Sequence, residues 1–161
     1  MVNVIIEYDT EPIEGIELED IVKSCAEKAF ELENVGFDTE ISVTLTDNEG
    51  IRKINAEYRN IDRETDVLSF PQFDFETPSH FDEDELFLDE GAVMLGDIVL
   101  SKDKIYEQAE EYGHGTLRET AYLTVHSLMH LLGYDHMEED EKTVMRKHEE
   151  DVLDALGYTR K

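Results

Sequence analysis

Three of the six histidines lie close together, in the segment HSLMHLLGYDH at positions 126–136. On a helix, His126 and His130 would lie on one face and one turn apart, because they are separated by four residues. Gly133 can end such a helix in a left-handed conformation, and the chain can then bring His136 back toward the pair. This spacing predicts that the three imidazoles bind a single metal ion.

Three protein ligands leave one position of a tetrahedral Zn²⁺ ion open, which is typical of catalytic rather than structural sites. Water held at that position can be ionised near neutral pH and attack an electrophile. An all-imidazole ligand set favours zinc, although nickel, copper or iron could also occupy it. We therefore predict one zinc ion per chain, with His126, His130 and His136 as its ligands.

The same spacing occurs in the H-E-x-x-H-x-x-G-x-x-H motif of the metzincin peptidases. In those enzymes the glutamate after the first histidine is the general base. Ser127 occupies this position here, and a serine cannot take that role at neutral pH. Asp135 is close in sequence, but we expect it to orient a metal ligand instead. A phosphodiester is a better substrate than a peptide, because a metal ion and a cationic clamp can act on it.

The hydrophobic pattern predicts the helices and strands that must position these residues. Residues 41–46 alternate apolar and polar side chains, whereas residues 18–32 have apolar side chains at helical spacing. Asp47 is a candidate N-cap for the helix that follows it. We predict one α+β domain over residues 1–161, a small mixed sheet of about four strands packed with about five helices. The predicted strands are 3–8, 41–46, 66–70 and 91–100, and the predicted helices are 18–32, 48–58, 102–112, 116–132 and 138–156.

Residues 72–90 differ from the rest of the chain, because they carry eight acids and Pro78 and have little apolar periodicity. Such a charge run is most often solvated. We expect a mobile acidic surface loop at this position.

The chain carries 41 acidic and 14 basic residues, which gives a net charge of −27. This charge should repel nucleic acid and anionic membranes at long range, which counts against a general nucleic-acid-coating protein. A local basic groove is still compatible with it, because exposed charges are screened beyond about 8–10 Å. No Lys or Arg occurs between residues 64 and 101, but a basic cluster precedes this stretch, formed by Arg52, Lys53, Arg59 and Arg63.

The composition also bears on the cellular compartment. No apolar run reaches the roughly 20 residues that a membrane helix needs, and residues 1–10 lack the features of a signal peptide. Cys25 is the only cysteine, so no intrachain disulfide can form. We therefore expect a protein of the reducing cytoplasm with no membrane partner.

Several segments carry a resemblance to a known family. HSLMHLLGYDH is similar to the H-G-x-x-H-L-x-G-Y-D-H signature of the YbeY family, bacterial rRNA maturation factors described as single-strand-specific endoribonucleases. INAEYRNIDRETDVLSFP at 54–71 resembles the family segment N-x-x-[FY]-R…T-D-V-L-S-F-P. LGDIVLS at 95–101 and EYGHGTLRETAYLTVH at 111–126 also match the family pattern. Together these segments cover most of residues 54–136.

The resemblance implies a zincin-like α+β fold and a zinc ion held by His126, His130 and His136. It implies cytoplasmic cleavage of single-stranded ribosomal RNA, at the 3′ end of small-subunit rRNA, and a role in ribosome quality control. The implied partners are the ribosome or small-subunit proteins and another ribonuclease, with no DNA expected.

The resemblance also points to two catalytic residues. Arg59 matches the invariant arginine of the family, and its planar cationic fork suits phosphate oxygens. An alternative is a surface arginine that pairs with a nearby acid. His114 matches a family histidine that could contact RNA or assist proton transfer. Its alternative is a histidine in the turn before a helix.

Some features limit what the resemblance implies. Ser127 stands where the family usually has glycine, which changes packing but removes no ligand. The acidic stretch 74–90 is a poor surface for RNA, so the substrate must approach elsewhere or the loop must move. No residue of the motif is an obvious general base, and the nucleophile could be water or the 2′-hydroxyl of the RNA. Two other functions stay open: a ribosome-assembly factor with a mainly structural metal, whose partners cleave the RNA, and a metallopeptidase-like hydrolase, which Ser127 disfavours.

Overall fold

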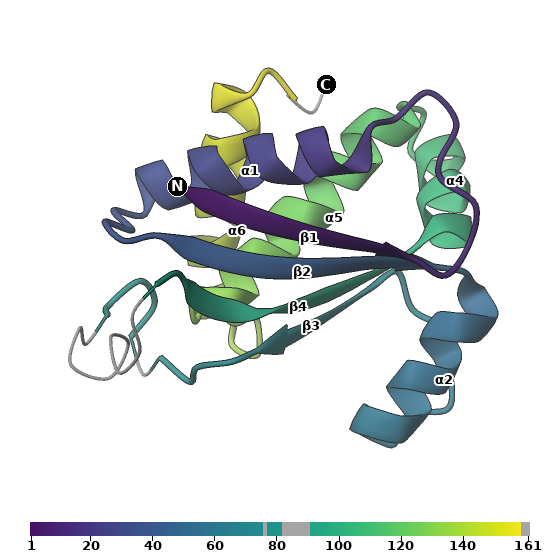
Figure 1. Cartoon of the computed structure of the whole chain (residues 1–161), viewed down its shortest axis with the longest axis horizontal. Coiled ribbons are helices and arrows are strands. Elements are labelled where there is room, and N and C mark those ends of the chain that lie inside the picture. Colours follow the sequence, from purple (N-terminus) through teal and green to yellow (C-terminus); the bar gives the residue numbers. More distant parts are fainter. Residues whose placement is uncertain (76, 82–90, 159–161) are drawn as a thin grey trace.

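A mixed four-stranded sheet organises the fold in the computed structural model, which describes residues 1–75, 77–81 and 91–158 (Figure 1). The strand order is β1-β2-β4-β3, with β1, β2 and β4 parallel and β3 antiparallel to β4. The mixed sheet of an α+β fold is therefore confirmed. The strands are β1 (Val2–Tyr8), β2 (Thr39–Thr46), β3 (Val67–Pro71) and β4 (Val93–Ser101).

Five helices occur in the described part of the chain, and their ends agree with the predicted ones within one residue. Local signals explain this agreement. The predicted N-cap is confirmed, because Asp47 accepts a hydrogen bond of 2.8 Å from the backbone N–H of Gly50. The helices are α1 (Leu18–Leu32), α2 (Asn48–Arg59), α4 (Lys102–Glu111), α5 (Thr116–Leu131) and α6 (Glu139–Ala155).

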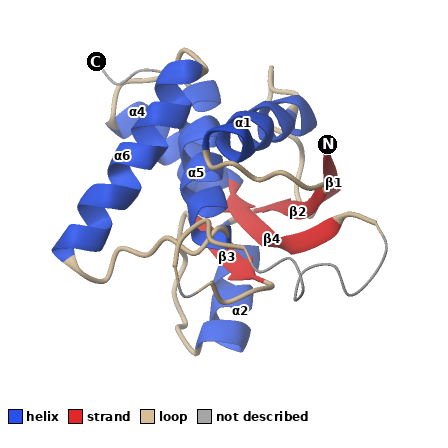
Figure 2. Ribbon diagram, turned by 90° about the vertical axis from the view of Figure 1, so that its left-hand side faces the viewer, coloured by secondary structure: helices blue, strands red, loops and turns tan. Residues whose placement is uncertain are grey.

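The main core lies between the sheet and helices α1, α5 and α6, which Figure 2 shows together on one side of the sheet. Helix α5 is the central element, since it contacts α1, α4, α6, β3 and β4. Its residues Leu128, Met129 and Leu131 are fully buried. Such packing on several sides fixes the position of any side chain that α5 presents to the surface.

Helix α2 covers the sheet separately, where it contacts β3 and β4. It packs on a second, small cluster of buried residues, to which the partly buried Phe70 also belongs. In Figure 1, α2 extends away from the body of the molecule. The members of this cluster are Ile51, Leu68 and Val99, with Ile54 and Phe70 packed against them.

Part of the loop expected over 72–90 packs inward, although Gln72, Asp74, Thr77 and His80 are exposed. Phe73, Phe75 and Phe81 are partly buried against the main core. The ring of Phe75 lies 5.7 Å from Phe73 and 5.1 Å from Phe81 between centroids. The spacing of these phenylalanines in the sequence follows neither a helical nor a strand period, so hydrophobic periodicity does not reveal that they pack against the core. Residues 76 and 82–90, with seven of the eight acids, lie outside the described residues.

No helix within the described ranges is both long and apolar enough to cross a membrane.

Candidate metal centre

The carboxyl end of α5 brings two of the predicted ligands together. The Nε2 atoms of His126 and His130 are 3.3 Å apart. Two nitrogens that are each about 2.0–2.1 Å from a tetrahedral ion lie about 3.3–3.4 Å from one another. The three histidines His126, His130 and His136 each offer a nitrogen, and these nitrogens all lie within 4.8 Å of one another. This geometry fits a single bound metal ion.

The turn after α5 brings His136 to the other two histidines. Gly133 has a φ of +103°, and a Cβ there would lie 3.0 Å from the Cβ of Phe75. Any other residue would be strained and crowded at this position. The His136 ring is consequently placed with its centroid 5.0 Å from that of His130 and 5.7 Å from that of His126.

Each of the two helix histidines uses one nitrogen to hold its ring in place. The Nδ1–H of His126 donates to Oε2 of Glu149 at 3.0 Å, and the Nδ1–H of His130 donates to the carbonyl of Tyr134 at 3.0 Å. Glu149 comes from α6 and is only 6% exposed. These hydrogen bonds leave both Nε2 lone pairs facing the same point, which is how histidine ligands are usually oriented around a metal.

The protonation of His130 also suits metal binding. Burial, together with charge repulsion from the neighbouring His126, lowers the pKa of His130 to about 4. A histidine must be neutral to bind a metal ion. His130 is therefore already in the metal-binding form at neutral pH.

A buried carboxylate, Glu33, forms hydrogen bonds to the turn that follows α5 and to its surroundings. Glu33, at the end of α1, accepts hydrogen bonds from the Tyr134 hydroxyl, from Ser79 Oγ at 2.7 Å and from His148 Nδ1 at 2.8 Å. Burial raises the pKa of Tyr134 above its ordinary value, and the bond to Glu33 adds to this effect. This network ties α1, α6 and the segment around Ser79 to the turn that carries His136.

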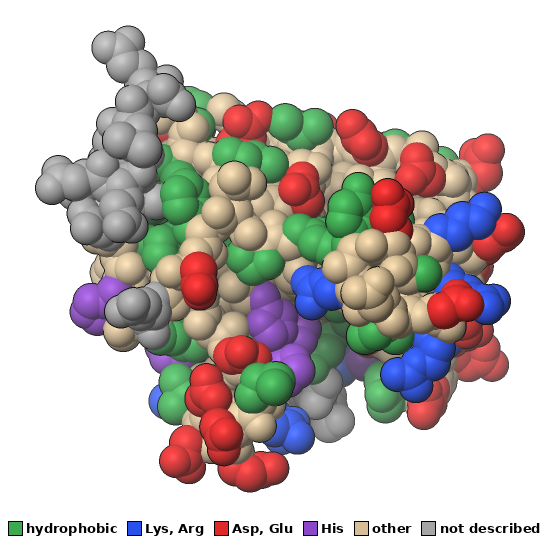
Figure 3. Space-filling view, turned by 90° about the horizontal axis from the view of Figure 1, so that it is seen from below, with side chains coloured by type: hydrophobic (Ala, Val, Ile, Leu, Met, Phe, Trp, Pro, Cys, Tyr) green, Lys and Arg blue, Asp and Glu red, His purple; other side chains and the backbone are tan. Residues whose placement is uncertain are grey.

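Arg59 lies in the same groove as the three histidines. It ends α2, its guanidinium lies 5.2 Å from the centroid of the Phe70 ring, and it donates a hydrogen bond to the carbonyl of Ser69. The groove has a volume of about 770 Å³. Figure 3 shows histidine side chains in a hollow on this face of the molecule, with basic and acidic side chains around it.

The basic residues near Arg59 differ from it in their ion pairs. Arg52 pairs with Asp62 at 2.8 Å, and Lys53 pairs with Glu49 at 3.3 Å. Within the described residues no carboxylate forms an ion pair with Arg59. The alternative of a surface arginine that pairs with an acid therefore has no support among these residues.

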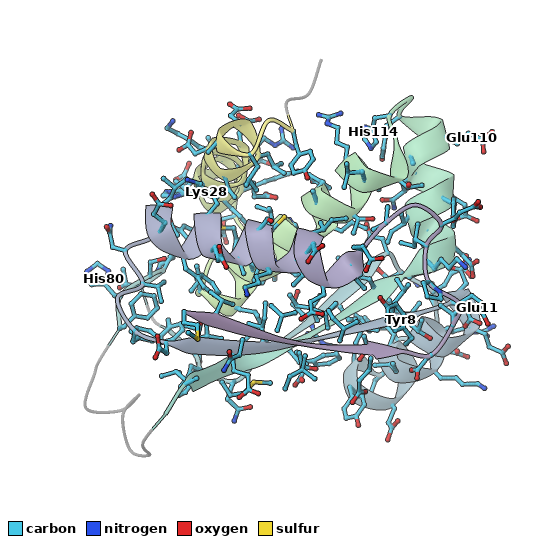
Figure 4. The ribbon with its side chains drawn as sticks, turned by 45° about the horizontal axis from the view of Figure 1, so that its top comes forward. Tyr8, Glu11, Lys28, His80, Glu110 and His114 are labelled. Atoms are coloured by element: carbon cyan, nitrogen blue, oxygen red, sulfur yellow. The ribbon has the colours of Figure 1, made fainter. Side chains whose placement is uncertain are left out.

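His114 is not part of this groove. Figure 4 shows it at the end of the molecule where α4 leads into α5. Its Nε2–H donates to Glu119 at 2.5 Å, and its Nδ1 accepts from Arg118 at 2.9 Å. Helix α5 begins at Thr116, after His114, and its ten residues of helix up to His126 span roughly 15 Å at 1.5 Å of rise per residue. The structure thus brings four of the five predicted site residues together and places His114 apart from them.

The structure also places Ser127 and Asp135, the residues that follow the first histidine and precede the third. Ser127 is fully buried, and its hydroxyl has no hydrogen-bond partner in the part of the chain that the structure describes. It does not line the groove. Asp135 does line the groove, and its Oδ1 accepts a hydrogen bond of 2.7 Å from the backbone N–H of His136. The Asp135 carboxylate therefore contacts the predicted ligand His136 at the histidine's backbone and not at its imidazole ring.

Glu149 was not identified from the sequence, although a signal for it exists. The buried face of α6 consists of Met145, Glu149, Val152 and Leu153. A carboxylate at an apolar position of an amphipathic helix needs a buried partner, and here that partner is His126. Glu33 has no comparable signal, because it ends a helix where an acid is ordinarily solvated.

Comparisons with known proteins agree on one family. The family model described as Endoribonuclease YbeY matches residues 3–157. Endoribonuclease YbeY of Agathobacter rectalis is 50% identical and covers 96% of this chain and 98% of that protein. Endoribonuclease YbeY of Clostridium botulinum is 52% identical, with 89% and 91% covered. The solution structure of TM1509 from Thermotoga maritima covers 98% of this chain and 92% of that one, with a TM-score of 0.57 and 21% identity, and it shares the fold.

Proposed function

The chain belongs to the endoribonuclease YbeY family, and from this premise we propose that it is a zinc-dependent endoribonuclease that cleaves single-stranded ribosomal RNA. One observation carries the proposal. His126, His130, His136 and Arg59 all line one groove, so a metal ion and a phosphate-binding cation would act on the same phosphodiester.

The histidine cluster would hold the zinc ion. Glu149 and the carbonyl of Tyr134 fix two of the rings with their Nε2 atoms free, so the ligands need little rearrangement to bind. A bound zinc ion would supply a Lewis acid that stabilises negative charge on the reacting phosphate and favours ionisation of the nucleophile. The nucleophile is either water or the 2′-hydroxyl of the RNA.

Arg59 would bind the phosphate. Its guanidinium contacts Phe70 and the Ser69 carbonyl, and these contacts orient the exposed side chain at the groove. The charge of an arginine is permanent, and its planar donors match two phosphate oxygens. Interaction with the charge that develops on the phosphate is the expected contribution of Arg59 to catalysis.

His114 receives a different assignment. Both of its ring nitrogens are engaged, one with Glu119 and one with Arg118, so it has no free nitrogen for proton transfer in the groove. We propose that it holds the beginning of α5 in place. A contact with RNA outside the groove stays a prediction.

The substrate and partners follow from the family resemblance and from the charge. We propose that the enzyme works in the cytoplasm on the 3′ end of small-subunit rRNA and in ribosome quality control, without DNA as a substrate. A net charge of −27 should weaken binding to free RNA. We therefore expect ribosomal proteins, or a second ribonuclease, to bring enzyme and RNA together.

The same acid excess favours one rival function, a ribosome-assembly factor with a mainly structural metal. Metal-quantified protein incubated with single-stranded RNA, duplex RNA and an unstructured protein separates the functions. We expect cleavage of single-stranded RNA alone, loss of cleavage and metal in His130→Ala, and loss of cleavage with metal retained in Arg59→Glu. Equal RNA cleavage by wild type and His130→Ala would reject the nuclease. Peptide cleavage without RNA cleavage would restore the peptidase.

A further inference from the structure

An exposed tyrosine lies directly beside the groove. The side chain of Tyr58, near the end of α2, is 66% exposed. Its ring meets Phe70 edge to face, with 5.6 Å between centroids and 66° between ring planes. This contact orients the Tyr58 ring, while most of the residue's surface faces solvent. A fixed, exposed aromatic ring of this kind is a surface on which another flat ring can stack.

The neighbours of Tyr58 connect it to the site. Phe70 contacts the ring of Tyr58, and the guanidinium of Arg59 lies over the Phe70 ring. Arg59 and Ser69, the residue before Phe70, both line the groove that contains the histidines. The three side chains of Tyr58, Phe70 and Arg59 thus form a continuous surface that leads out of the groove over the edge strand β3.

The charge of this region differs from that of the whole protein. Residues 49–63 carry four basic residues (Arg52, Lys53, Arg59, Arg63) and three acidic ones (Glu49, Glu57, Asp62), which gives a net charge of +1 in a chain of −27. Arg52 and Lys53 are paired with Asp62 and Glu49, whereas Arg59 has no carboxylate partner among the described residues. An extended polyanion would be repelled from most of the surface and attracted here. The exposed ring of Tyr58 beside this charge favours a nucleic-acid strand over an acidic protein segment as the occupant, because nucleobases can stack on it.

We propose that Tyr58 is a base-stacking residue for the RNA that enters the groove, and this proposal rests on the proposed function. An unpaired nucleobase packs on the exposed face of Tyr58 while a neighbouring phosphate binds Arg59. Proteins that bind single-stranded RNA combine such aromatic surfaces with cations along the backbone. Bases within a duplex are already stacked on one another, so only a single strand can make this contact. Tyr58 then contributes to the preference for single strands.

The test measures KM and kcat of the zinc-loaded full chain on a single-stranded RNA. Tyr58→Ala should raise KM at least about fivefold, the smaller effect expected for one lost stacking contact, with kcat changed less than twofold. Tyr58→Phe should match wild type, because the ring is kept. Tyr112→Ala is the matched control, since Tyr112 is 61% exposed but lies beside His114, away from the groove. Thermal unfolding of all three variants should match wild type.

A second arm uses RNAs with one abasic nucleotide at successive positions. At one position near the cleavage site, the abasic nucleotide should raise the KM of wild type by the same factor as the Tyr58→Ala substitution does. The KM of Tyr58→Ala should not change further when that base is removed. If wild type cleaves RNA and Tyr58→Ala has an unchanged KM, the stacking role is wrong while the proposed function stands. A loss that is equal for Tyr112→Ala would also reject it. If wild type does not cleave RNA at all, the proposed function itself fails.

Discussion

The two ends of helix α5 carry similar residues with different properties. At the carboxyl end, His126 donates to the buried Glu149, and at the amino end, His114 donates to the buried Glu119. The difference lies in the second ring nitrogen. The Nε2 of His126 faces another imidazole, whereas the Nδ1 of His114 already accepts from Arg118. A histidine next to a carboxylate is thus a candidate ligand only when its other nitrogen is free.

Replacement of a histidine at each end should give the largest contrast. His126→Ala should reduce bound zinc from about one per chain to trace amounts and lower RNA cleavage at least about hundredfold, because one of three ligands is lost. His114→Gln should keep its metal and most of its activity. Metal quantification by mass spectrometry and cleavage rates check both variants. A His114→Gln protein that lost zinc would contradict the assignment of His114 away from the metal centre.

Replacement of Glu149 and Glu119, the carboxylates that pair with His126 and His114, should give a smaller difference in zinc binding between the two ends of α5. Glu149→Gln should weaken zinc binding about 10–100-fold, because the partner of a ligand histidine loses its charge. Glu119→Gln should leave zinc affinity unchanged. Competition with a chromophoric chelator measures both affinities. Equal affinities for Glu149→Gln and wild type would show that Glu149 does not tune the site.

The histidine cluster could be predicted from the sequence, whereas the residues around it could not. His126, His130 and His136 are brought together by local rules, one helical turn and one glycine turn. Glu149 and Phe70 reach the site through the packing of α6 and β3. The buried face of α6 indicates that Glu149 needs a partner, but no local pattern identifies His126 as that partner. His114 shows the opposite case, because motif matching identifies the residue but cannot reveal that Arg118 and Glu119 occupy its nitrogens.

The pH dependence of stability tests the histidine environment at the carboxyl end of α5. The pKa of His130 is about 4 in the folded chain, against an ordinary value of 6.5. Between these values the unfolded chain takes up a proton that the folded chain does not, so the stability of the metal-free protein falls as the pH drops from 6.5 toward 4. Above 6.5 this contribution is constant. Urea unfolding of the metal-free proteins should show that the free energy of unfolding falls more between pH 7 and pH 5 in wild type than in His130→Gln. Equal decreases in the two proteins would contradict a lowered pKa of His130.

The smallest expected effect concerns the buried hydroxyls between the two ends of α5. Ser127 Oγ has no partner among the described residues, whereas Thr124 Oγ1 donates to the Thr120 carbonyl at 2.7 Å. Ser127→Ala should therefore leave the free energy of unfolding unchanged or raise it slightly. Thr124→Val should lower it by about 1 kcal/mol. Chemical denaturation measures both, and a clear loss for Ser127→Ala would mean that its hydroxyl has a partner.

The claim on which this account depends is that the histidine groove cleaves single-stranded RNA with a bound metal ion. The most direct measurement is the cleavage rate of one single-stranded RNA by metal-quantified protein, before chelation, after chelation, and after addition of one equivalent of zinc. We predict that activity disappears with the metal, returns with zinc in wild type and in His114→Gln, and does not return in His126→Ala. Cleavage that persists in the metal-free protein, or returns in His126→Ala, would contradict the account.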